Sequence, residues 1–170
     1  MPSTKKPYTK TEMLGAYQIL GGIIGLIVIC ILIFKIDSFN LTTLLFIGIA
    51  LSFYCYSIFC GALIFRNEDR GLKHSMFNQF IQLICFSVWG VSFQYVSGIA
   101  LGIDLVFTNG FDYHISFVLS NIRVFIDPDI GTRIVGINFI ALFIILFINR
   151  QRRILRQQFQ EKQLSEFGHQ

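Results

Sequence analysis

The sequence predicts an all-α membrane protein: a four-transmembrane-helix bundle with a small extracytoplasmic β-hairpin or three-stranded cap between the third and fourth helices. Of the 170 residues, 54% are hydrophobic and 14% are charged, whereas a soluble domain carries about 25% charged residues. Mean hydropathy is +0.62, and long uncharged runs recur along the chain. This composition excludes a disordered chain and a cytosolic globular enzyme, because so apolar a surface needs lipid as its solvent.

Four segments are predicted to span the bilayer, at about 13–34, 41–65, 80–101 and 128–149. A spanning helix needs roughly 18 or more apolar residues to cross ~30 Å of hydrocarbon. The first three runs satisfy this outright, and Thr9 with Glu12 predicts a capping box that starts the first helix. The fourth apolar run is shorter, and a start signal extends it, with Asp127 as N-cap and Pro128 at the first helical position.

The basic residues predict the orientation and the domain limits. Eleven of the 14 lysines and arginines fall on one side if all four segments span. Because cytoplasmic loops carry this excess, both termini are predicted to be cytoplasmic. We expect a cytoplasmic segment at 1–9, a transmembrane domain at 10–149 and a basic helical tail at 150–170. The net charge of +4 is explained by anionic lipid of the inner leaflet, without nucleic acid.

The segment between the last two predicted helices, about 102–127, has a strand pattern. Asn109-Gly110 is a strong hairpin signal, and 122–126 could add a third strand. Open strand edges are not tolerated in hydrocarbon, so we expect the cap above the outer surface. Beyond the turn, apolar Phe111, Tyr113, Ile115 and Phe117 alternate with polar Asp112, His114 and Ser116.

Residues for known catalytic or metal chemistry are scarce. The four cysteines, Cys30, Cys55, Cys60 and Cys85, lie inside predicted spans and form no C-x-x-C pair. The three histidines fall in different segments, so they cannot converge on one metal ion in this topology. We therefore predict no catalytic residues, no cofactor and no metal site, and a protein that is not an enzyme.

Three groups of residues are candidate contact sites. The glycine pairs allow close packing within the bundle or between copies. The polar residues of the third span could line a pocket for a lipid or small amphiphile, or could form interhelical hydrogen bonds. The arginines after the fourth span could contact inner-leaflet lipid or a partner. These groups are Gly21, Gly25, Gly98 and Gly102; Gln82, Trp89 and Gln94; and Arg150, Arg152, Arg153 and Arg156.

The favoured function is that of a non-enzymatic integral membrane subunit that self-associates or anchors a partner. Membrane lipid and either further copies or a second protein are the expected partners. The alternative is an oligomeric pore-forming or membrane-perturbing effector, whose channel would be lined by uncharged polar helix faces. A second alternative is a lipid-modifying enzyme, for which Asp104, Asp112 and His114 are the candidate residues.

Overall fold

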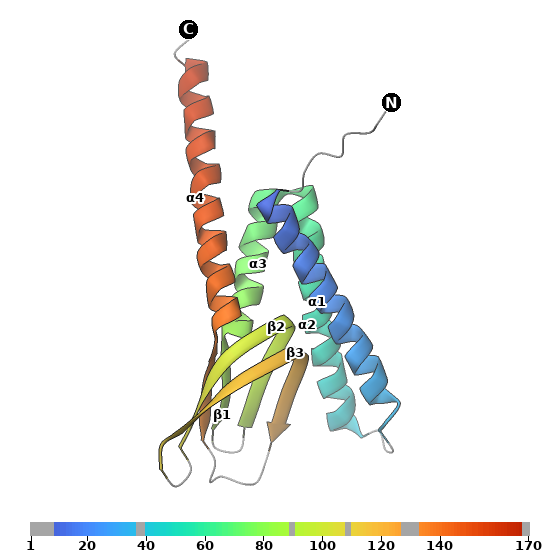
Figure 1. Ribbon diagram of the computed structural model, residues 1–170. Helices are drawn as coiled ribbons and strands as arrows, with labels where there is room; N and C mark the ends of the chain where they lie inside the picture. The colour runs from blue at the N-terminus through green and yellow to red at the C-terminus, as the bar shows by residue number, and fades with distance from the viewer. Residues whose placement is uncertain (1–8, 37–39, 89–90, 108–109, 127–132, 168–170) are drawn as a thin grey trace, which may run out of the picture.

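The chain has a mixed α/β fold in the computed structural model, which describes residues 9–36, 40–88, 91–107, 110–126 and 133–167 (Figure 1). The all-α prediction is therefore wrong. The elements of the described ranges, in order, are α1 (Lys10–Ile33), α2 (Leu41–Arg66), α3 (Glu68–Leu83), β1 (Ile84–Val88), β2 (Val91–Val106), β3 (Asp112–Ile126), β4 (Ile134–Asn138) and α4 (Phe139–Phe167).

The first two helices form an antiparallel pair close to the predicted positions (Figure 1). The predicted capping box is confirmed, because Thr9 N donates to Glu12 Oε2 at 2.7 Å and Glu12 N donates to Thr9 Oγ1 at 3.3 Å. Asn40 caps α2 by accepting from Thr43 N at 2.8 Å. Of the described helices, α1 and α2 are long and apolar enough to span a membrane.

The third predicted span, 80–101, is not a helix. Helix α3 begins earlier, where Asn67 Oδ1 accepts from Arg70 N at 3.1 Å, and it ends at Leu83. The chain then continues as β1 and β2. In this segment polar Cys85, Ser87, Ser92 and Gln94 alternate with apolar residues. This period of two is typical of a strand with one polar and one apolar face. Counting the length of an apolar run, which predicted a spanning helix here, does not detect such an alternation.

The fourth predicted span, 128–149, is also wrong as a single helix. Residues 134–138 form β4, and the helix begins at Phe139, where Asn138 Oδ1 accepts from Ile140 N at 3.0 Å. The expected start signal at Asp127 and Pro128 lies outside the described residues. Helix α4 then runs past Arg150 to Phe167, so residues 150–167 of the predicted tail are helical.

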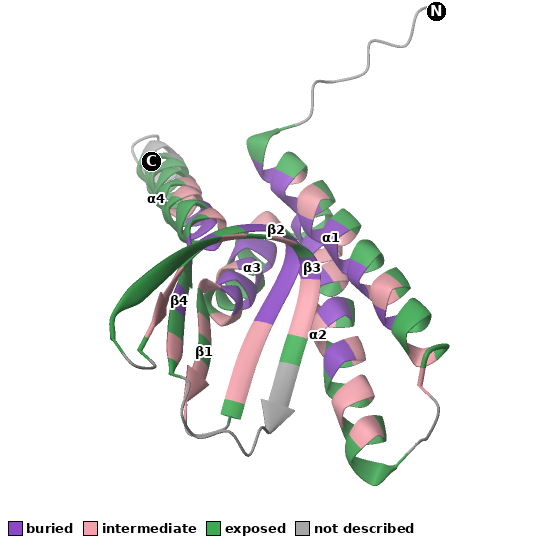
Figure 2. Cartoon of the chain, turned by 60° about the horizontal axis from the view of Figure 1, so that its bottom comes forward, coloured by how far each residue is buried: buried purple, intermediate pink, exposed green. Residues whose placement is uncertain are grey.

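The sheet is antiparallel and strongly curved (Figure 2). The strand order is β1-β4-β2-β3, and β1 also pairs with β2, so β1, β4 and β2 close on one another. Strands β2 and β3 do form an antiparallel pair, from Val91↔Ile126 to Val106↔Asp112, and Asn109 of the predicted hairpin signal lies outside the described residues. The segment 122–126 is the end of β3 rather than a third strand. The sheet uses residues from 84 to 138 and is therefore more than a cap at 102–127.

Two glycines bring the sheet into contact with α1. A Cβ on Gly21 would lie 2.5 Å from the backbone N of Gly98 in β2, so neither the helix nor the strand could approach as closely with a larger residue. Gly98 has a φ of +102°, and the β2–β3 register shifts between Val96 and Ile99. At this bulge β2 meets α1, and just before it Phe93 and Tyr95 pack against Phe53 of α2.

Candidate functional site

The curved sheet has a polar inner face and an apolar outer face. On the inner face Gly136 of β4 lies between Cys85 of β1 and Asp104 of β2. Sheets of soluble proteins show the opposite arrangement, with polar residues outward, whereas this one matches the pattern of a sheet surrounded by lipid. The exposed outer-face residues are Ile84, Phe86, Ile99, Leu101, Ile103, Tyr113, Ile115, Phe117, Leu119, Val135 and Ile137.

A cavity of about 340 Å³ opens on the inner face, and we call it the sheet cavity. Cys85 Sγ donates to Asp104 Oδ1 at 3.3 Å, and the Ser87 and Ser92 hydroxyls share a hydrogen bond of 2.5 Å. A Cβ on Gly136 would overlap Asp104 and Cys85, so glycine leaves the room that these two groups need. The lining residues are Cys85, Phe86, Ser87, Ser92, Phe93, Gln94, Asp104, Arg123 and Ile134.

Of the residues of the predicted pocket, Gln94 lines the sheet cavity and Gln82 lies next to it. Gln82, at the end of α3, and Gln94, on β2, line a smaller adjoining cavity together with Asp104 and Asn138. The Gln82 side chain is held by a hydrogen bond of 2.9 Å from Ser97 N to its Oε1. Trp89 lies outside the described residues. The sequence placed these three residues on one helix, but Gln82 and Gln94 come from a helix and a strand.

A buried network of neutral polar groups joins the helices to the sheet, and we call it the junction network. Ser57 of α2 is its centre. Its Oγ donates to Gln18 O at 3.1 Å and accepts from Asn78 Nδ2 at 3.2 Å and from Ser97 Oγ at 2.8 Å. Ser75 Oγ donates to Gln18 Oε1 at 2.8 Å. Because every member is uncharged and buried, the network fixes the positions of α1, α2, α3 and β2 without ionised groups.

The predicted glycine sites lie on different kinds of element. Gly21 and Gly25 are on α1, where Gly21 contacts β2 and Gly25 lies against the ring of Tyr54. Gly98 and Gly102 are on β2, so they form no helix groove. A Cβ on Gly102 would lie 3.0 Å from Ile137 O of the neighbouring β4.

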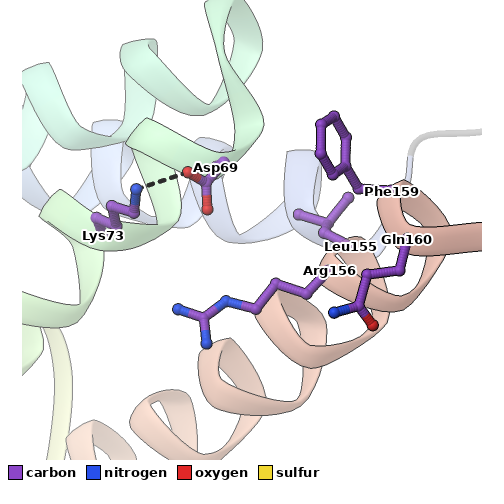
Figure 3. A pocket seen from close by; sticks show the side chains of 6 residues that line it. All are labelled: Asp69, Lys73, Leu155, Arg156, Phe159 and Gln160. Carbon is purple, nitrogen blue, oxygen red and sulfur yellow. Dashed lines mark ion pairs between the residues drawn. The ribbon is translucent and has the colours of Figure 1, made fainter. Parts of the chain in front are cut away.

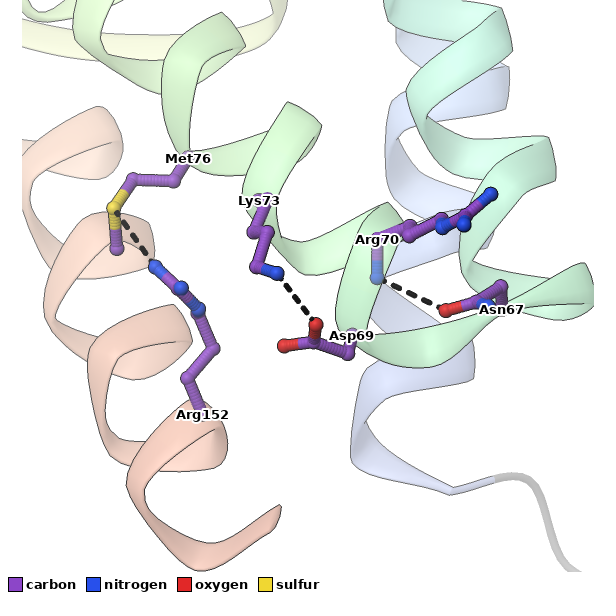
Figure 4. A network of polar contacts seen from close by, with 6 residues as sticks. All are labelled: Asn67, Asp69, Arg70, Lys73, Met76 and Arg152. Atoms are coloured by element: carbon purple, nitrogen blue, oxygen red, sulfur yellow. Dashed lines mark hydrogen bonds and ion pairs between the residues drawn. The ribbon is translucent and has the colours of Figure 1, made fainter. Parts of the chain in front are cut away.

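The predicted arginine site lies on α4 near α3. A cleft of about 490 Å³ separates the two helices, with Asp69 and Lys73 of α3 facing Arg156 of α4 (Figure 3). Lys73 Nζ lies 2.8 Å from Asp69 Oδ2, and Arg152 Nη1 is 3.9 Å from Met76 Sδ (Figure 4). The hydrogen bond from Lys73, with the charges of Lys73, Arg152 and Arg156, holds the pKa of Asp69 below its usual value. Arg150 and Arg153 are exposed.

The three candidate residues for lipid chemistry come together near the end of the β2–β3 hairpin. Asp104 and His114 occupy facing positions in the ladder. His114 Nε2 lies 3.5 Å from Asp112 Oδ2, and both of these side chains are mostly exposed.

Strand β3 forms an edge of the sheet. It pairs with β2, and the described residues supply no strand on its other side. The edge is covered where Ser120 Oγ donates to Gly21 O of α1 at 3.1 Å. From Asp112 to Leu119 it is exposed, apart from the half-buried Ser116 and Val118, and we call this segment the open edge. It contains no lysine, arginine or proline.

No known protein family, no curated protein and no solved structure matches the chain. Among the described residues, no group of three or more histidine, cysteine, aspartate or glutamate side chains could hold a metal ion. A functional assignment must therefore rest on the geometry of this molecule.

Proposed function

We propose that this protein is a non-enzymatic integral membrane subunit that self-associates by pairing the open edges of two copies. The observation that carries the proposal is the open edge itself, a long unblocked strand edge flanked by exposed apolar side chains. Tyr113, Ile115, Phe117 and Leu119 are each more than half exposed on its outer face. Such an edge is a template for pairing with another chain.

The position of the sheet beside α1 and α2 supports its location at membrane depth. Helix α1 has 24 residues, which at about 1.5 Å per residue exceed the ~30 Å hydrocarbon core. An apolar cavity lined by Ile29 and Ile33 of α1, Ile47 of α2 and Ile122 of β3 lies where the sheet meets the far ends of these helices. If α1 and α2 cross the bilayer, the apolar outer face of the sheet meets lipid.

The basic residues support an orientation with both termini in the cytoplasm. The N-terminus of α1 and the C-terminal end of α4 lie at the same end of the molecule, opposite the sheet (Figure 1). Helix α2 ends at Arg66 and α3 begins at Glu68, so Arg66 and Arg70 lie at the α2–α3 connection, which is at that same end (Figure 1). Cytoplasmic segments are enriched in such residues, so the sheet would occupy the outer half of the bilayer.

In hydrocarbon an unpaired backbone N–H or C=O costs several kcal/mol, because no water can satisfy it. Soluble proteins protect edge strands with charged side chains, lysine above all, or with proline or a bulge, and between 112 and 119 the one such group is Asp112 at the end of the segment. An open edge at this depth therefore requires a partner strand.

A second copy is the partner that the edge suits best. In antiparallel pairing about a two-fold axis at Ile115, Tyr113 faces the partner's Phe117 and no like charges are opposed. Cross-strand aromatic pairs contribute roughly 0.2–1 kcal/mol each. The pairing would also extend the sheet continuously from one copy into the next.

The test compares two lysine substitutions on the same face of the sheet. Ile115 lies on the open edge, and its cross-strand neighbour Ile103 lies on the internal strand β2. Native mass spectrometry of the extracted protein should show a dimer that Ile115→Lys converts to monomer and Ile103→Lys preserves. A monomeric wild type, or equal loss of dimer in both variants, would contradict the proposal.

A pore assembled from several copies is a second candidate, and the polar inner face of the sheet supports it. A pore would let ions or a small dye leak from proteoliposomes at a rate that rises with protein density. Arg123→Glu would then change the ion preference of the leak because Arg123 lines the sheet cavity. Tight liposomes at high protein density would exclude a pore and leave the dimer proposal standing.

A further inference from the structure

We propose that the sheet cavity binds a small zwitterion that carries a primary ammonium group and a carboxylate or phosphate. This site does not depend on the pairing of open edges, because all of its lining residues come from one copy. The inference rests on the placement of two opposite charges, on the neutral groups between them and on the size of the cavity.

Asp104 and Arg123 line the same cavity but do not neutralise each other. Within the described ranges no ion pair joins them, and the side-chain hydrogen bond to the Asp104 carboxylate comes from the weakly donating thiol of Cys85. A carboxylate in a partly buried cavity favours a cationic ligand group, while a guanidinium binds carboxylate or phosphate through two parallel N–H bonds. One molecule that carries both charges pairs with Asp104 through its cationic group and with Arg123 through its anionic group.

The register explains how residues far apart on β2 reach one cavity. Asp104 lies near the end of β2, beside Gly136 of β4, whereas Gln94 lies ten positions earlier and pairs with Arg123 of β3. Because the sheet curves (Figure 2), both parts of β2 contribute to the same lining. The neutral groups of Ser87, Ser92 and Gln94 can hydrogen-bond to the ligand without adding charge.

The cavity is small and partly apolar. Its volume of about 340 Å³ is near the lower limit of the roughly 300–1,000 Å³ found for ligand pockets, so it suits a molecule of amino-acid size and is too small for a whole lipid. Phe86 and Phe93 pair with each other on the outer face, the face that does not carry Ser87 and Ser92, and they add apolar atoms to the lining. These atoms suit the short methylene linker between the two charges.

The experiment titrates phosphoethanolamine into the purified full-length protein in detergent, with isothermal titration calorimetry as the readout. We expect saturable binding with one site per chain. Ethanolamine alone and inorganic phosphate alone should each bind at least about tenfold more weakly, because each engages one charged wall. The proposal would be overturned if phosphoethanolamine showed no saturable binding, or if ethanolamine or inorganic phosphate bound as tightly as phosphoethanolamine. This outcome needs the wild-type protein alone.

Substitutions then locate the site. Asp104→Asn and Arg123→Gln should each weaken phosphoethanolamine binding at least about tenfold, whereas Asp112→Asn, an exposed carboxylate outside the lining, should leave it unchanged. Circular dichroism identifies variants that still fold, and Arg123→Lys provides a milder change if Arg123→Gln does not. Unchanged binding in folded Asp104 and Arg123 variants would overturn the proposal.

Two sources could supply this chemistry, a free zwitterion or the headgroup of phosphatidylethanolamine. Repeating the titration in nanodiscs distinguishes them. If the headgroup is the natural ligand, phosphatidylethanolamine in the nanodisc weakens binding of the soluble probe relative to phosphatidylcholine alone. If the ligand is free, the affinity is the same in both nanodiscs. Either result supports the site, and loss of binding in both would contradict it.

Discussion

Ile103 and Ile115 face each other across the β2–β3 ladder on the outer face of the sheet, but their surroundings differ. Ile103 has β4 on the far side of its strand and is 37% exposed, whereas Ile115 lies on the open edge and is 73% exposed. These two isoleucines thus share one face of the sheet, but Ile103 lies on an internal strand and Ile115 on the boundary strand. This pair makes the proposed self-association testable with a matched control.

The junction network predicts that Ser57 is important for stability. Ser57→Ala removes one donated and two accepted hydrogen bonds and leaves buried groups unpaired, so we expect a loss of about 1–3 kcal/mol in the free energy of unfolding. Ser52→Ala is the control, because its exposed hydroxyl bonds to Gly48 O within the same helix. Denaturant titration in detergent micelles measures both, and equal stability of the two variants would show that the network contributes little.

The contact between Gly21 and Gly98 predicts a steric effect. In Gly21→Ala the new methyl group meets the backbone of β2, which cannot move as a flexible side chain could, so we expect a loss of about 1–3 kcal/mol. Gly48→Ala is the matched control, because a Cβ there has no atom within 4 Å among the described residues. This variant should stabilise α2 by up to about 1 kcal/mol. Similar melting temperatures for both variants would contradict the close contact.

The cap of α4 predicts the cost of changing Asn138. Its Oδ1 accepts from Ile140 N at 3.0 Å, so Asn138→Ala should lower the free energy of unfolding by about 0.5–2 kcal/mol. Asn138→Asp keeps the acceptor and should retain more of the stability than Asn138→Ala. If the two variants had the same free energy of unfolding in a denaturant titration, Asn138 would not act as the N-cap of α4.

The ion pair between Asp69 and Lys73 predicts a weak pH dependence. Because the pKa of Asp69 is lowered in the folded protein, its stabilising effect is present above the usual aspartate pKa and is lost as the pH falls through the folded value. The pair is about half exposed, so we expect Asp69→Asn to change stability by less than about 1 kcal/mol at neutral pH. The difference between wild type and variant should vanish in acid, and a difference that grows in acid would contradict the assignment.

The sequence predicts some elements well because their signals are local. Thr9 and Glu12 lie within one helical turn, and the apolar runs of α1 and α2 are continuous, so length and capping suffice. The alternation of Tyr113 and Ile115 with His114 likewise marks a strand within a few residues. These features need no information about distant parts of the chain.

The rest of the sheet could not be predicted from the sequence, because its strands pair with segments far away along the chain. Ile84 of β1 pairs with Ile137 of β4, and nothing local to either segment indicates that partner. Both segments are apolar enough that run length favours a helix. Gln82 and Gln94 were identified as pocket residues, but Arg123 was missed, since its role depends on register with Gln94. The alternation of polar Ser92 and Gln94 with apolar residues was the local signal that indicated a strand in this segment.

Cysteine cross-linking in the native membrane tests the central claim most directly. In a Cys30→Ser, Cys55→Ser background, which removes the exposed thiols among the described residues, cysteines are placed singly at Tyr113, Ile115, Phe117 and Ile103. Edge pairing brings one of the first three within the roughly 4.4–6.8 Å Cα separation of a disulfide, while the Ile103 positions stay about 14 Å apart. We predict a covalent dimer at one edge position and none at Ile103. No dimer at any edge position, or equal dimer at Ile103, would contradict the account.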